Sequence, residues 1–497
     1  MAKPKRLARK SLLKRFRELL QGMDACEDVD LKDALRLGGD KIRVPAPALP
    51  LSIRLGGEDG YPLHLYPEPR FEEDGTLAYS GDYLLVDPDS YFQDISGFLR
   101  LDQGETLTLG RGDPLQRLLL RYPKSVADQH LRLKLSAKGL AFKNKSEQAG
   151  VCLAPLTQEG WIERLAQQRL RALDRLVEAL GGPIEPLESG AALALIDEVN
   201  ALMRDEPYRV PNAQGRNSGL LALPDRPRPI FGGDLHARLD NLLVILTQGA
   251  FLDALIDGSA LLILLGDAVQ SDASGQEAEM DGSMLMMDLI FRLKRRFPER
   301  VFYLRGNHDS FSDELSKSGV PQGLLWEQAL IEGRGMRYRD AMQTFYDRLP
   351  YVAASSGYLA CHAGPPLGKL SWEALVDIER HPKLAHQLTH VRLRQSGRAN
   401  GYGYGPGDLA RLRKRLGVKR EAPIVVGHTP PRHTQTCWMN AGGIPNHHIV
   451  YGSHPDWIGV ITRPEKRLVP LIYPSEPMLS VYNRRAHAAL SSEDAHG

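Results

Sequence analysis

The pattern of apolar and polar positions divides most of the chain into three stretches. From residue 40 to 156, short runs such as LPLSIRL, LTLGR and LRLKL alternate apolar with polar residues between Gly, Asp and Pro turns, which predicts an all-β sandwich. From 157 to 225 the apolar spacing becomes three and four, as in WIERLAQQRLRALDRLVEAL, and predicts a helical connector. Within it, PNAQGRNSG predicts a linker loop. From 226 to 475, strand and helix patterns alternate, which predicts an α/β domain built as an α+β layered sandwich.

The two ends of the chain have different patterns. In the opening MAKPKRLARKSLLKRFRELL, Leu12, Phe16 and Leu19 share one helical face, and Arg and Lys fill the other. Residues 1–39 are therefore predicted to form a basic helical segment that docks or is solvated, with contact to a membrane surface or RNA as the alternative. The segment lacks the apolar stretch of a secretory signal. Residues 476–497 are predicted to be a flexible tail.

Composition narrows the classes of function and the compartment. Of the 497 residues, 25% are charged and the formal net charge is +2, so neither disorder nor general nucleic-acid binding follows from the charge balance. No apolar run reaches the length of a transmembrane helix. Four cysteines are scattered without metal-site or disulfide-framework spacing: Cys26, Cys152, Cys361 and Cys437. We therefore expect a cytoplasmic protein with no membrane span and no nucleic-acid partner.

Several apolar strands of the last stretch end in residues that bind metals. The strands and the residues that follow them are PIFGGDLH with Asp234 and His236, LLILLGD with Asp267, VFYLRGNHD with Asn307 and His308, YLACHAG with His362, and PIVVGHT with His428. Any one of them fits a buried core histidine or a helix cap. Together, carboxylate, imidazole and amide oxygen form the mixed set that suits Mn²⁺, Fe or Zn²⁺ in a two-metal centre. Such a centre activates a bridging water and holds a phosphoryl group for in-line attack.

These segments resemble the calcineurin-like metallophosphoesterases, and more narrowly the phosphoprotein phosphatase family. The family segments GDxHG, GDxVDRG, RGNHE, HGG and GH appear in the same order as GDLHA, GDAVQSD, RGNHD, HAG and GHT, within roughly residues 229 to 470. The resemblance implies two divalent ions, with Mn²⁺ expected first. It implies that Asp234 and His236 bind the first ion, that Asp267 bridges both, and that Asn307, His362 and His428 bind the second.

The resemblance also assigns roles to three residues that do not bind metal. His308 would be the general acid that protonates the leaving oxygen, a role that suits an imidazole beside a metal ligand. Arg398, in RANGYGYG, falls where the family has a phosphate-binding arginine, and a guanidinium grips two phosphoryl oxygens well. Tyr451, in YGSHPDWIG, corresponds to a tyrosine over the active site. Arg398 and Tyr451 are therefore candidate substrate-binding residues.

The chain departs from the family pattern in its second segment. Gln270 and Ser271 stand where the family has the aspartate that orients the acid histidine and an arginine that binds phosphate. Because extra residues precede the next helix, Asp272 or Asp281 is a candidate for the missing carboxylate. HAGPP resembles the symmetrical diadenosine tetraphosphate hydrolases, so a nucleotide substrate is the alternative. Pro430 replaces a second histidine, which argues against the exonuclease and cyclic-phosphodiesterase branches.

The predicted sandwich resembles a forkhead-associated domain. Gly110-Arg111, His130 and the stretch 146–150 match that family's segments, but Ala127 replaces its phosphate-binding serine. A docking sandwich for a protein partner is therefore favoured over a phosphothreonine pocket. For the whole chain we expect a phosphatase that acts on phosphoserine or phosphothreonine in proteins. The alternatives are a dinucleoside-polyphosphate hydrolase and a phospho-binding scaffold with little turnover.

Overall fold

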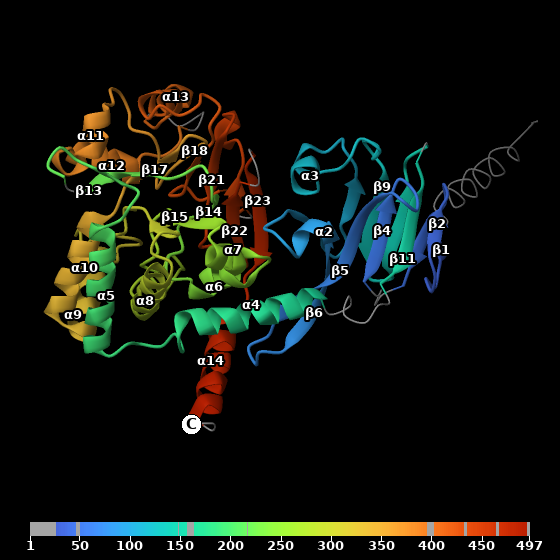
Figure 1. Ribbon diagram of the computed structural model, residues 1–497, viewed down its shortest axis with the longest axis horizontal. Coiled ribbons are helices and arrows are strands. Elements are labelled where there is room, and N and C mark those ends of the chain that lie inside the picture. Colours follow the sequence, from blue (N-terminus) through green and yellow to red (C-terminus); the bar gives the residue numbers. More distant parts are fainter. Residues whose placement is uncertain are drawn as a thin grey trace, which may run out of the picture. The chain divides into compact units, whose positions relative to one another are not determined.

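The computed structural model describes residues 26–45, 50–147, 149–156, 164–215, 217–394, 402–431, 435–463 and 467–494 (Figure 1). The chain divides into two compact units. The first contains Met1–Arg70 and Ala78–Gln167, and the second contains Phe71–Leu77 and Gln168–Gly497.

The described part of the first unit is a two-sheet β structure. One sheet has the spatial order β1 (Cys26–Asp28), β3 (Lys41–Val44), β10 (Gly139–Asn144), β9 (Leu131–Ser136) and β8 (Thr106–Leu109). The other has the order β2 (Leu35–Leu37), β11 (Val151–Pro155), β4 (Leu51–Leu55), β5 (Tyr61–Phe71), β6 (Leu77–Val86) and β7 (Phe98–Leu101). The short helices α2 (Pro88–Tyr91) and α3 (Pro114–Leu119) lie in the connections.

The period of two in the sequence explains the core of this unit. Leu131, Leu133 and Leu135 of β9 are buried, whereas Arg132 and Lys134 between them are exposed. Successive residues of a strand point to opposite faces, so one face of the sheet enters the core and the other meets solvent. The all-β architecture predicted for this region is therefore confirmed.

The prediction of a helical segment over residues 1–39 is wrong for the part that the structure describes. Residues 1–25 lie outside the described residues. Cys26–Asp28 and Leu35–Leu37 are the strands β1 and β2 of the two sheets, and β2 pairs antiparallel with β11. Both strands are short, and their pairing partners lie far along the chain, so local periodicity does not reveal them.

The second unit contains two stacked sheets. One sheet has the order β12 (Arg209–Pro211), β13 (Asn217–Ala222), β17 (Val352–Ser355), β18 (Tyr358–Cys361), β19 (Ile424–Val426), β21 (His447–Val450) and β20 (Cys437–Trp438). The other has the order β16 (Val301–Tyr303), β15 (Ala260–Leu264), β14 (Arg228–Gly232), β22 (Trp457–Thr462) and β23 (Val469–Pro474).

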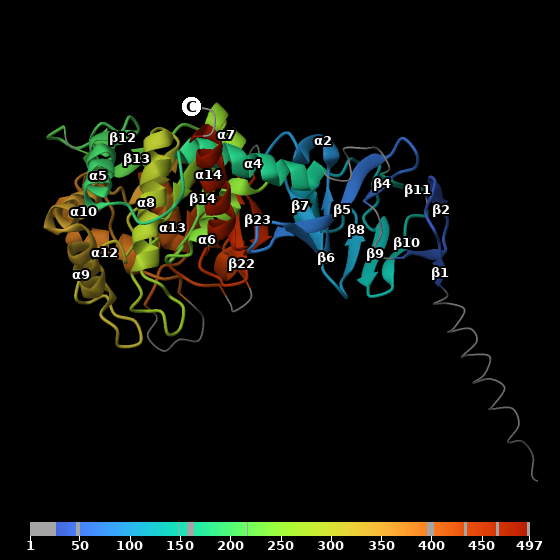
Figure 2. The ribbon, with the colours of Figure 1, turned by 90° about the horizontal axis from the view of Figure 1, so that it is seen from below.

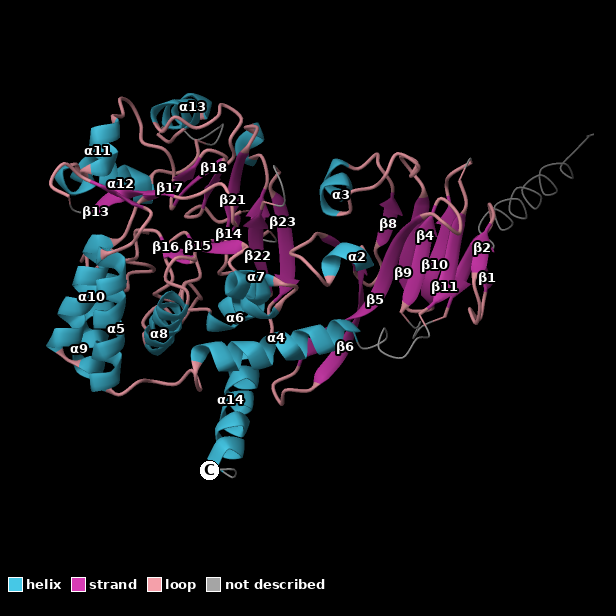
Figure 3. Cartoon of the chain, in the orientation of Figure 1, coloured by secondary structure: helices cyan, strands magenta, loops and turns pink. Residues whose placement is uncertain are grey.

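Helices cover the outer faces of the two sheets (Figures 1 and 3). The helices described from residue 164 onward, including those that pack only on other helices, are α4 (Arg164–Leu180), α5 (Ser189–Arg204), α6 (Leu239–Thr247), α7 (Phe251–Asp257), α8 (Asp281–Arg296), α9 (Gln322–Arg334), α10 (Met336–Arg348), α11 (Trp372–Val376), α12 (Pro382–His390), α13 (Pro406–Arg415) and α14 (Met478–Asp494), with the 3-10 turns η1 (Ile378–Arg380) and η2 (Ala441–Gly443). Helices α6, α7 and α8 contact the sheet that contains β14, and α5 packs on α8 and α10. Helix α11 contacts β13 of the other sheet.

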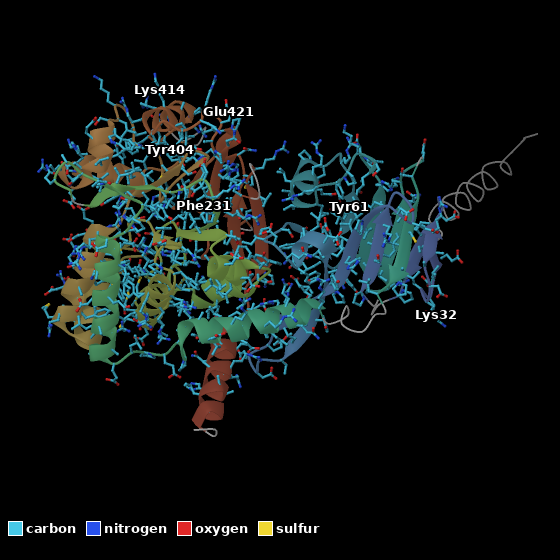
Figure 4. The ribbon with its side chains drawn as sticks, viewed as in Figure 1. Lys32, Tyr61, Phe231, Tyr404, Lys414 and Glu421 are labelled. Carbon is cyan, nitrogen blue, oxygen red and sulfur yellow. The ribbon has the colours of Figure 1, made fainter. Side chains whose placement is uncertain are left out.

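Alternation along the strands builds the two cores of this unit. Leu359 of β18 faces the core under α11 to α13, whereas Ala360 faces the core between the sheets. In β19, Ile424 likewise faces the core under the helices and Val425 faces the core between the sheets. Phe231 of β14, labelled in Figure 4, lies in the core between the sheets. Four layers in the order helix, sheet, sheet, helix result, and the predicted layered α/β fold is confirmed.

The boundary between the predicted connector and the layered domain differs from the sequence prediction. The predicted connector extends to residue 225, but β12 and β13 within it form a hairpin, and β13 pairs parallel with β17. The predicted linker loop over 211–219 contains the turn at 212–215, but it also contains the end of β12 and the first residues of β13. The hairpin belongs to the layered sheet because Leu220 and Leu221 of β13 are buried in its two cores.

The prediction of a flexible tail over residues 476–497 is wrong for the described residues up to 494. Helix α14 packs beside α6 (Figure 2), and Val481, Tyr482 and Ala486 on one of its faces are buried. The side chain of Asp240 accepts a hydrogen bond from Leu479 N at 2.8 Å, near the start of the helix. Spacings of three and four among apolar residues are typical of a docked amphipathic helix.

Among the described residues, no single helix is long and apolar enough to cross a membrane. The bent pair α6 and α7 passes the same test of length and composition only when its two helices are taken together.

Candidate metal centre

The ligand-type residues lie in the loops that follow parallel strands of the two sheets, and these loops meet around one cavity. Strands β14, β15 and β16 are parallel to one another, and β18 is parallel to β19. Loops after parallel strands leave a sheet at the same edge, where open α/β sheets bind their ligands. A cavity of about 520 Å³ there is lined by Asp234, His236, Asp267, Asn307, His308, Glu314, Leu315, Ser316, Lys317, His390, Arg392, His428, Pro430 and Tyr451. His362 lies buried beneath it, in contact with Asn307 and His428.

One group of ligand atoms surrounds Nε2 of His362. This atom lies 3.0 Å from Oδ1 of Asn307, 3.2 Å from Nδ1 of His428 and 3.2 Å from Oδ2 of Asp267. Ligand atoms bound to one ion at about 2.0–2.2 Å lie roughly 3.0–3.5 Å apart. The Nδ1–H of His362 donates to the carbonyl of Leu265 at 2.7 Å, which fixes the tautomer and leaves Nε2 to bind.

A second group shares Asp267 with the first. Potential ligand atoms of His236, Asp267 and His308 lie within 4.8 Å of one another, and those of Asp267, His362 and His428 do likewise. Nδ1 of His236 is 3.0 Å from the carbonyl of Gln270, so its Nε2 is the free nitrogen. A carboxylate common to two groups is the arrangement that bridges two ions.

The buried carboxylates fit a bound cation. Oδ1 of Asp234 is buried and has no hydrogen-bond partner among the described residues. The backbone leaves room around both carboxylates, because a Cβ on Gly427 would lie 2.2 Å from Oδ1 of Asp234 and one on Gly306 would lie 2.1 Å from Oδ1 of Asp267. Any residue other than glycine at position 427 or 306 would therefore clash with one of these carboxylate oxygens.

The two buried carboxylates, Asp234 and Asp267, are stabilised in their charged form by nearby positive charge. Burial raises the pKa of Asp234. Burial alone would raise the pKa of Asp267. The nearby histidines, His362 above all, outweigh burial, so the net pKa of Asp267 lies well below its ordinary value. Burial lowers the pKa of His362, but Asp267 and Asp234 outweigh that effect and raise it to about 9. Two divalent ions would supply the same positive charge, so the donor set and its surroundings fit a two-metal centre.

Four residues at the site have left-handed backbone angles. The values of φ are 44° at His236, 52° at Asp267, 65° at Gln270 and 60° at His428. This region costs free energy for residues other than glycine, and such residues gather at functional sites. The fold holds these residues in strained turns at the ends of its strands.

Gln270 is the hydrogen-bond partner of His308. Its Oε1 lies 2.5 Å from Nδ1 of His308, and its Nε2 donates to the carbonyl of Gln322 at 3.3 Å. The bond to Gln322 orients the amide so that the oxygen faces the imidazole. Burial chiefly lowers the pKa of His308, to about 4, although Asp267 opposes this effect.

Neither carboxylate proposed from the sequence orients His308. Asp272 is bound instead by the hydroxyls of Tyr451 and Ser453, and Asp281 is exposed at the start of α8. The amide of Gln270 takes their place without adding charge. Tyr451 lines the cavity, but its hydroxyl is bonded to Asp272, and burial and that carboxylate raise its pKa.

Several residues of this site were not predicted from the sequence. Arg398 lies outside the described residues, whereas Arg392 lines the cavity, with its Nε 3.3 Å from Nε2 of His428. Asp309 is fully buried and accepts hydrogen bonds from the hydroxyl of Tyr303 and from Gly306 N, both at 2.7 Å. Lys317 also lines the cavity. The Arg-Leu-Arg run that contains Arg392 was the available signal for that residue.

One family model matches the part of the chain that contains the site. Residues 228–432 match the family described as calcineurin-like phosphoesterase. No curated protein matches the chain.

Two of the solved structures that resemble this chain are phosphatases. A protein serine/threonine phosphatase from Saccharomyces cerevisiae with similarity to human phosphatase PP5 is 16% identical, with a TM-score of 0.43, over 58% of this chain and 90% of that one. A cold-active protein-tyrosine phosphatase of the psychrophile Shewanella sp. is 13% identical, with a TM-score of 0.33, over 51% of this chain and 82% of that one.

The matched residues 228–432 contain the ligand-type side chains from Asp234 to His428. The chain therefore contains a calcineurin-like metallophosphoesterase domain and is a metal-dependent phosphoester hydrolase.

Proposed function

We propose that the chain hydrolyses phosphomonoesters, with phosphoserine or phosphothreonine in a protein as its substrate. The observation that carries this proposal is the gathering of the ligand-type side chains and His308 around one cavity that Lys317 and Arg392 also line. Metal ligands, a proton-transfer group and cations within one cavity suit a phosphate dianion. The same cavity would admit a side chain that carries the phosphate.

Two divalent ions complete this site in the proposal. Asp234, His236 and Asp267 would hold one, and Asp267 would share the other with Asn307, His362 and His428. We propose Mn²⁺, because carboxylate, amide oxygen and imidazole together suit it. When bound, the ions supply the positive charge that activates water and neutralises the phosphoryl oxygens.

His308 would transfer the proton to the leaving oxygen. Gln270 accepts the Nδ1–H of the imidazole at 2.5 Å, so Nε2 is the nitrogen left for the substrate. An imidazole held in one orientation needs no rearrangement to meet the leaving group. The ring of His236 packs against that of His308 at 4.9 Å, nearly perpendicular, and limits its movement.

The cavity favours a phosphoprotein over a dinucleotide. Among the described residues that line it, the aromatic side chains are histidines and Tyr451, and the Tyr451 hydroxyl is bonded to Asp272. Nucleobases are held mainly by stacking on aromatic faces, at about 1–3 kcal/mol per base. Apart from the metal-site histidines and His308, the aromatic residues in this lining are His390 and Tyr451, and the ring of His390 is already stacked on that of His386 at 4.0 Å.

The test uses the full chain loaded with Mn²⁺ and three substrates at equal concentration: a phosphoserine peptide, a phosphothreonine peptide and diadenosine tetraphosphate. Release of inorganic phosphate from the peptides at a higher kcat/KM than cleavage of the dinucleotide is the expected result. Preferred cleavage of the dinucleotide would favour the nucleotide hydrolase instead. Metal uptake without turnover of any ester would indicate a phospho-binding scaffold.

We also propose that the first unit is a forkhead-associated-like docking domain. The guanidinium of Arg111 donates to the carbonyl of Lys124 at 3.0 Å, and Nδ1 of His130 accepts from Ala127 N at 3.0 Å. Both side chains are therefore engaged within the loop that would read a phosphothreonine. This favours docking through shape over docking through phosphate.

The four free cysteines favour a reducing, cytoplasmic compartment.

A further inference from the structure

A tight hairpin turn presents Lys317 to the cavity. The backbone of Lys317 pairs with that of Val320 in both directions, with N–O distances of 3.0 and 2.8 Å. The two residues between them, Ser318 and Gly319, have φ angles of 53° and 81°. Two left-handed residues in a two-residue loop are typical of a type I′ turn, which gives a hairpin a defined geometry. Lys317 therefore stands at a fixed position on the hairpin.

Hydrogen bonds tie this hairpin to the loop that follows β15. Nζ of Lys317 donates to the carbonyl of Asp272 at 2.9 Å. Nε2 of Gln322 donates to the carbonyls of Ser271 and Glu277, each at 2.9 Å. The two loops thus hold each other, and they hold the Lys317 side chain along the cavity that contains Asp267 and His308.

The Lys317 ammonium has capacity for a further ligand. It carries three N–H donors. Among the described residues, one acceptor lies within hydrogen-bond distance, the Asp272 carbonyl, while the nearest Asp272 carboxylate oxygen is 4.0 Å away. The Lys317 side chain is 40% exposed, so an anion in the cavity can reach it.

Ser271 does not take part in this cavity. It lines a neighbouring cavity of about 590 Å³ together with Arg238 and Asn241. Ser271, which stands where the resembled family has an arginine, therefore lines a different cavity. Lys317, from another loop, lines the cavity that contains the ligand-type residues.

We propose that Lys317 binds the phosphoryl group of the substrate and supplies the charge that Ser271 does not. This inference rests on the proposed function and adds the residue that recognises the phosphate. An ammonium is a compact charge whose donors rotate freely, so it can follow the phosphoryl oxygens from substrate to product. The same contact would bind inorganic phosphate, the product of the reaction.

The test compares three variants of the full chain, each loaded with Mn²⁺: Lys317→Gln, Lys317→Arg and, as the control, Lys414→Gln. Lys414 is an exposed lysine on α13, away from both cavities (Figure 4). The measurements are kcat/KM on a phosphothreonine peptide, the inhibition constant of inorganic phosphate, and bound metal.

Loss of one charge-assisted phosphate contact should lower kcat/KM about ten- to a hundredfold in Lys317→Gln and weaken inhibition by phosphate by a similar factor. Bound metal should stay at the wild-type level. Lys317→Arg should recover most of both losses, and Lys414→Gln should match the wild type. A purely structural lysine would instead alter metal content, or would leave phosphate inhibition unchanged.

The inference and the proposed function fail in different ways. Unchanged kcat/KM and phosphate inhibition in Lys317→Gln, with an active wild type, would overturn the role of Lys317 and leave the phosphatase standing. If the wild type released no phosphate from any ester, calorimetric binding of inorganic phosphate to the two proteins would still decide about Lys317. Equal phosphate affinity in that experiment would overturn the inference.

Discussion

The Oε1 atom of Gln270 lies 2.5 Å from Nδ1 of His308 and orients the imidazole that faces the metal ligands. The related phosphatases that the sequence resembles have an aspartate at this position. An amide holds the ring as a carboxylate does, but it adds no negative charge to stabilise the protonated imidazole. Gln270 thus orients the imidazole of His308 as a carboxylate would, but without the negative charge that would raise the pKa of the ring.

Gln270→Glu should therefore raise activity on substrates with poor leaving groups. A carboxylate beside His308 raises the pKa of the imidazole and increases the fraction that can donate a proton. One pKa unit corresponds to a factor of ten, so we expect kcat on a phosphoserine peptide to rise roughly three- to tenfold near neutral pH. The rate profile should be measured from pH 5 to pH 9, and its alkaline limb, where the proton donor is lost, should move to higher pH.

Gln270→Ala is the matched control, because it removes the hydrogen bond without adding charge. It should lower kcat and leave bound metal unchanged. If the alanine and glutamate variants both kept the wild-type rate and pH profile, Gln270 would have no part in the reaction.

His308→Ala should lower the rate about 10²–10⁴-fold on a phosphoserine peptide, because the leaving alkoxide then lacks a proton donor. The loss should be much smaller on p-nitrophenyl phosphate, whose leaving group departs without a proton. Both substrates should be measured on the same preparation with its metal content known. Equal losses on the two substrates would contradict the proton-transfer role and indicate a ligand or structural histidine.

Asp267→Asn should abolish turnover by weakening metal binding while the fold is retained. The carboxylate belongs to both groups of ligand atoms, so its loss removes negative charge from each. Added Mn²⁺ should raise the Tm of the wild type, because a ligand of the folded state stabilises it, and should raise that of the variant much less. Asp257→Asn, at an exposed position at the end of α7, is the control. A variant with the wild-type metal content and rate would show that the ligand assignment is wrong.

A buried ion cluster should make stability depend on pH below about 4.5. Glu206 bonds Arg209 at 2.9 Å and Lys294 at 2.6 Å, and all three side chains are buried. Burial raises the pKa of Glu206, but its two cationic partners outweigh that effect and lower it from 4.5. Because the folded pKa lies below the unfolded one, the carboxylate stabilises the protein above pH 4.5, and this contribution is lost as the pH falls through the folded pKa.

Glu206→Gln should reduce the free energy of unfolding at pH 7 by about 3–5 kcal/mol, because two buried cations lose their partner. Burial lowers the pKa of Lys294 and of Arg209, but both stay protonated in the acid range and add no pH dependence there. Urea unfolding at pH 7 and pH 4 should therefore show a smaller difference in the variant than in the wild type. Glu198→Gln, in an exposed pair with Arg295, should change stability by less than about 1 kcal/mol.

The sequence by itself was enough to predict the layered fold and to nominate the ligand-type residues around the cavity. An apolar run followed by glycine and a polar residue identifies the carboxyl end of a strand. For Asp234, Asp267 and His362, the whole pattern lies within ten residues of the side chain concerned. The period of two along β9 likewise indicated the sandwich of the first unit. Such features depend on neighbours in the chain, so local patterns record them.

Only the tertiary structure decided which residues meet across the chain. Gln270 and His308 are 38 positions apart, and Lys317 and Asp272 are 45 apart. Glu476 pairs with Arg169 across 307 positions, just before the helix α14 that local composition suggested was a tail. No periodicity relates such pairs, because each contact depends on how strands and loops stack after folding. The orienting amide, the cation that faces the metal ligands and the docked C-terminal helix therefore follow from packing of distant segments, which a local pattern does not encode.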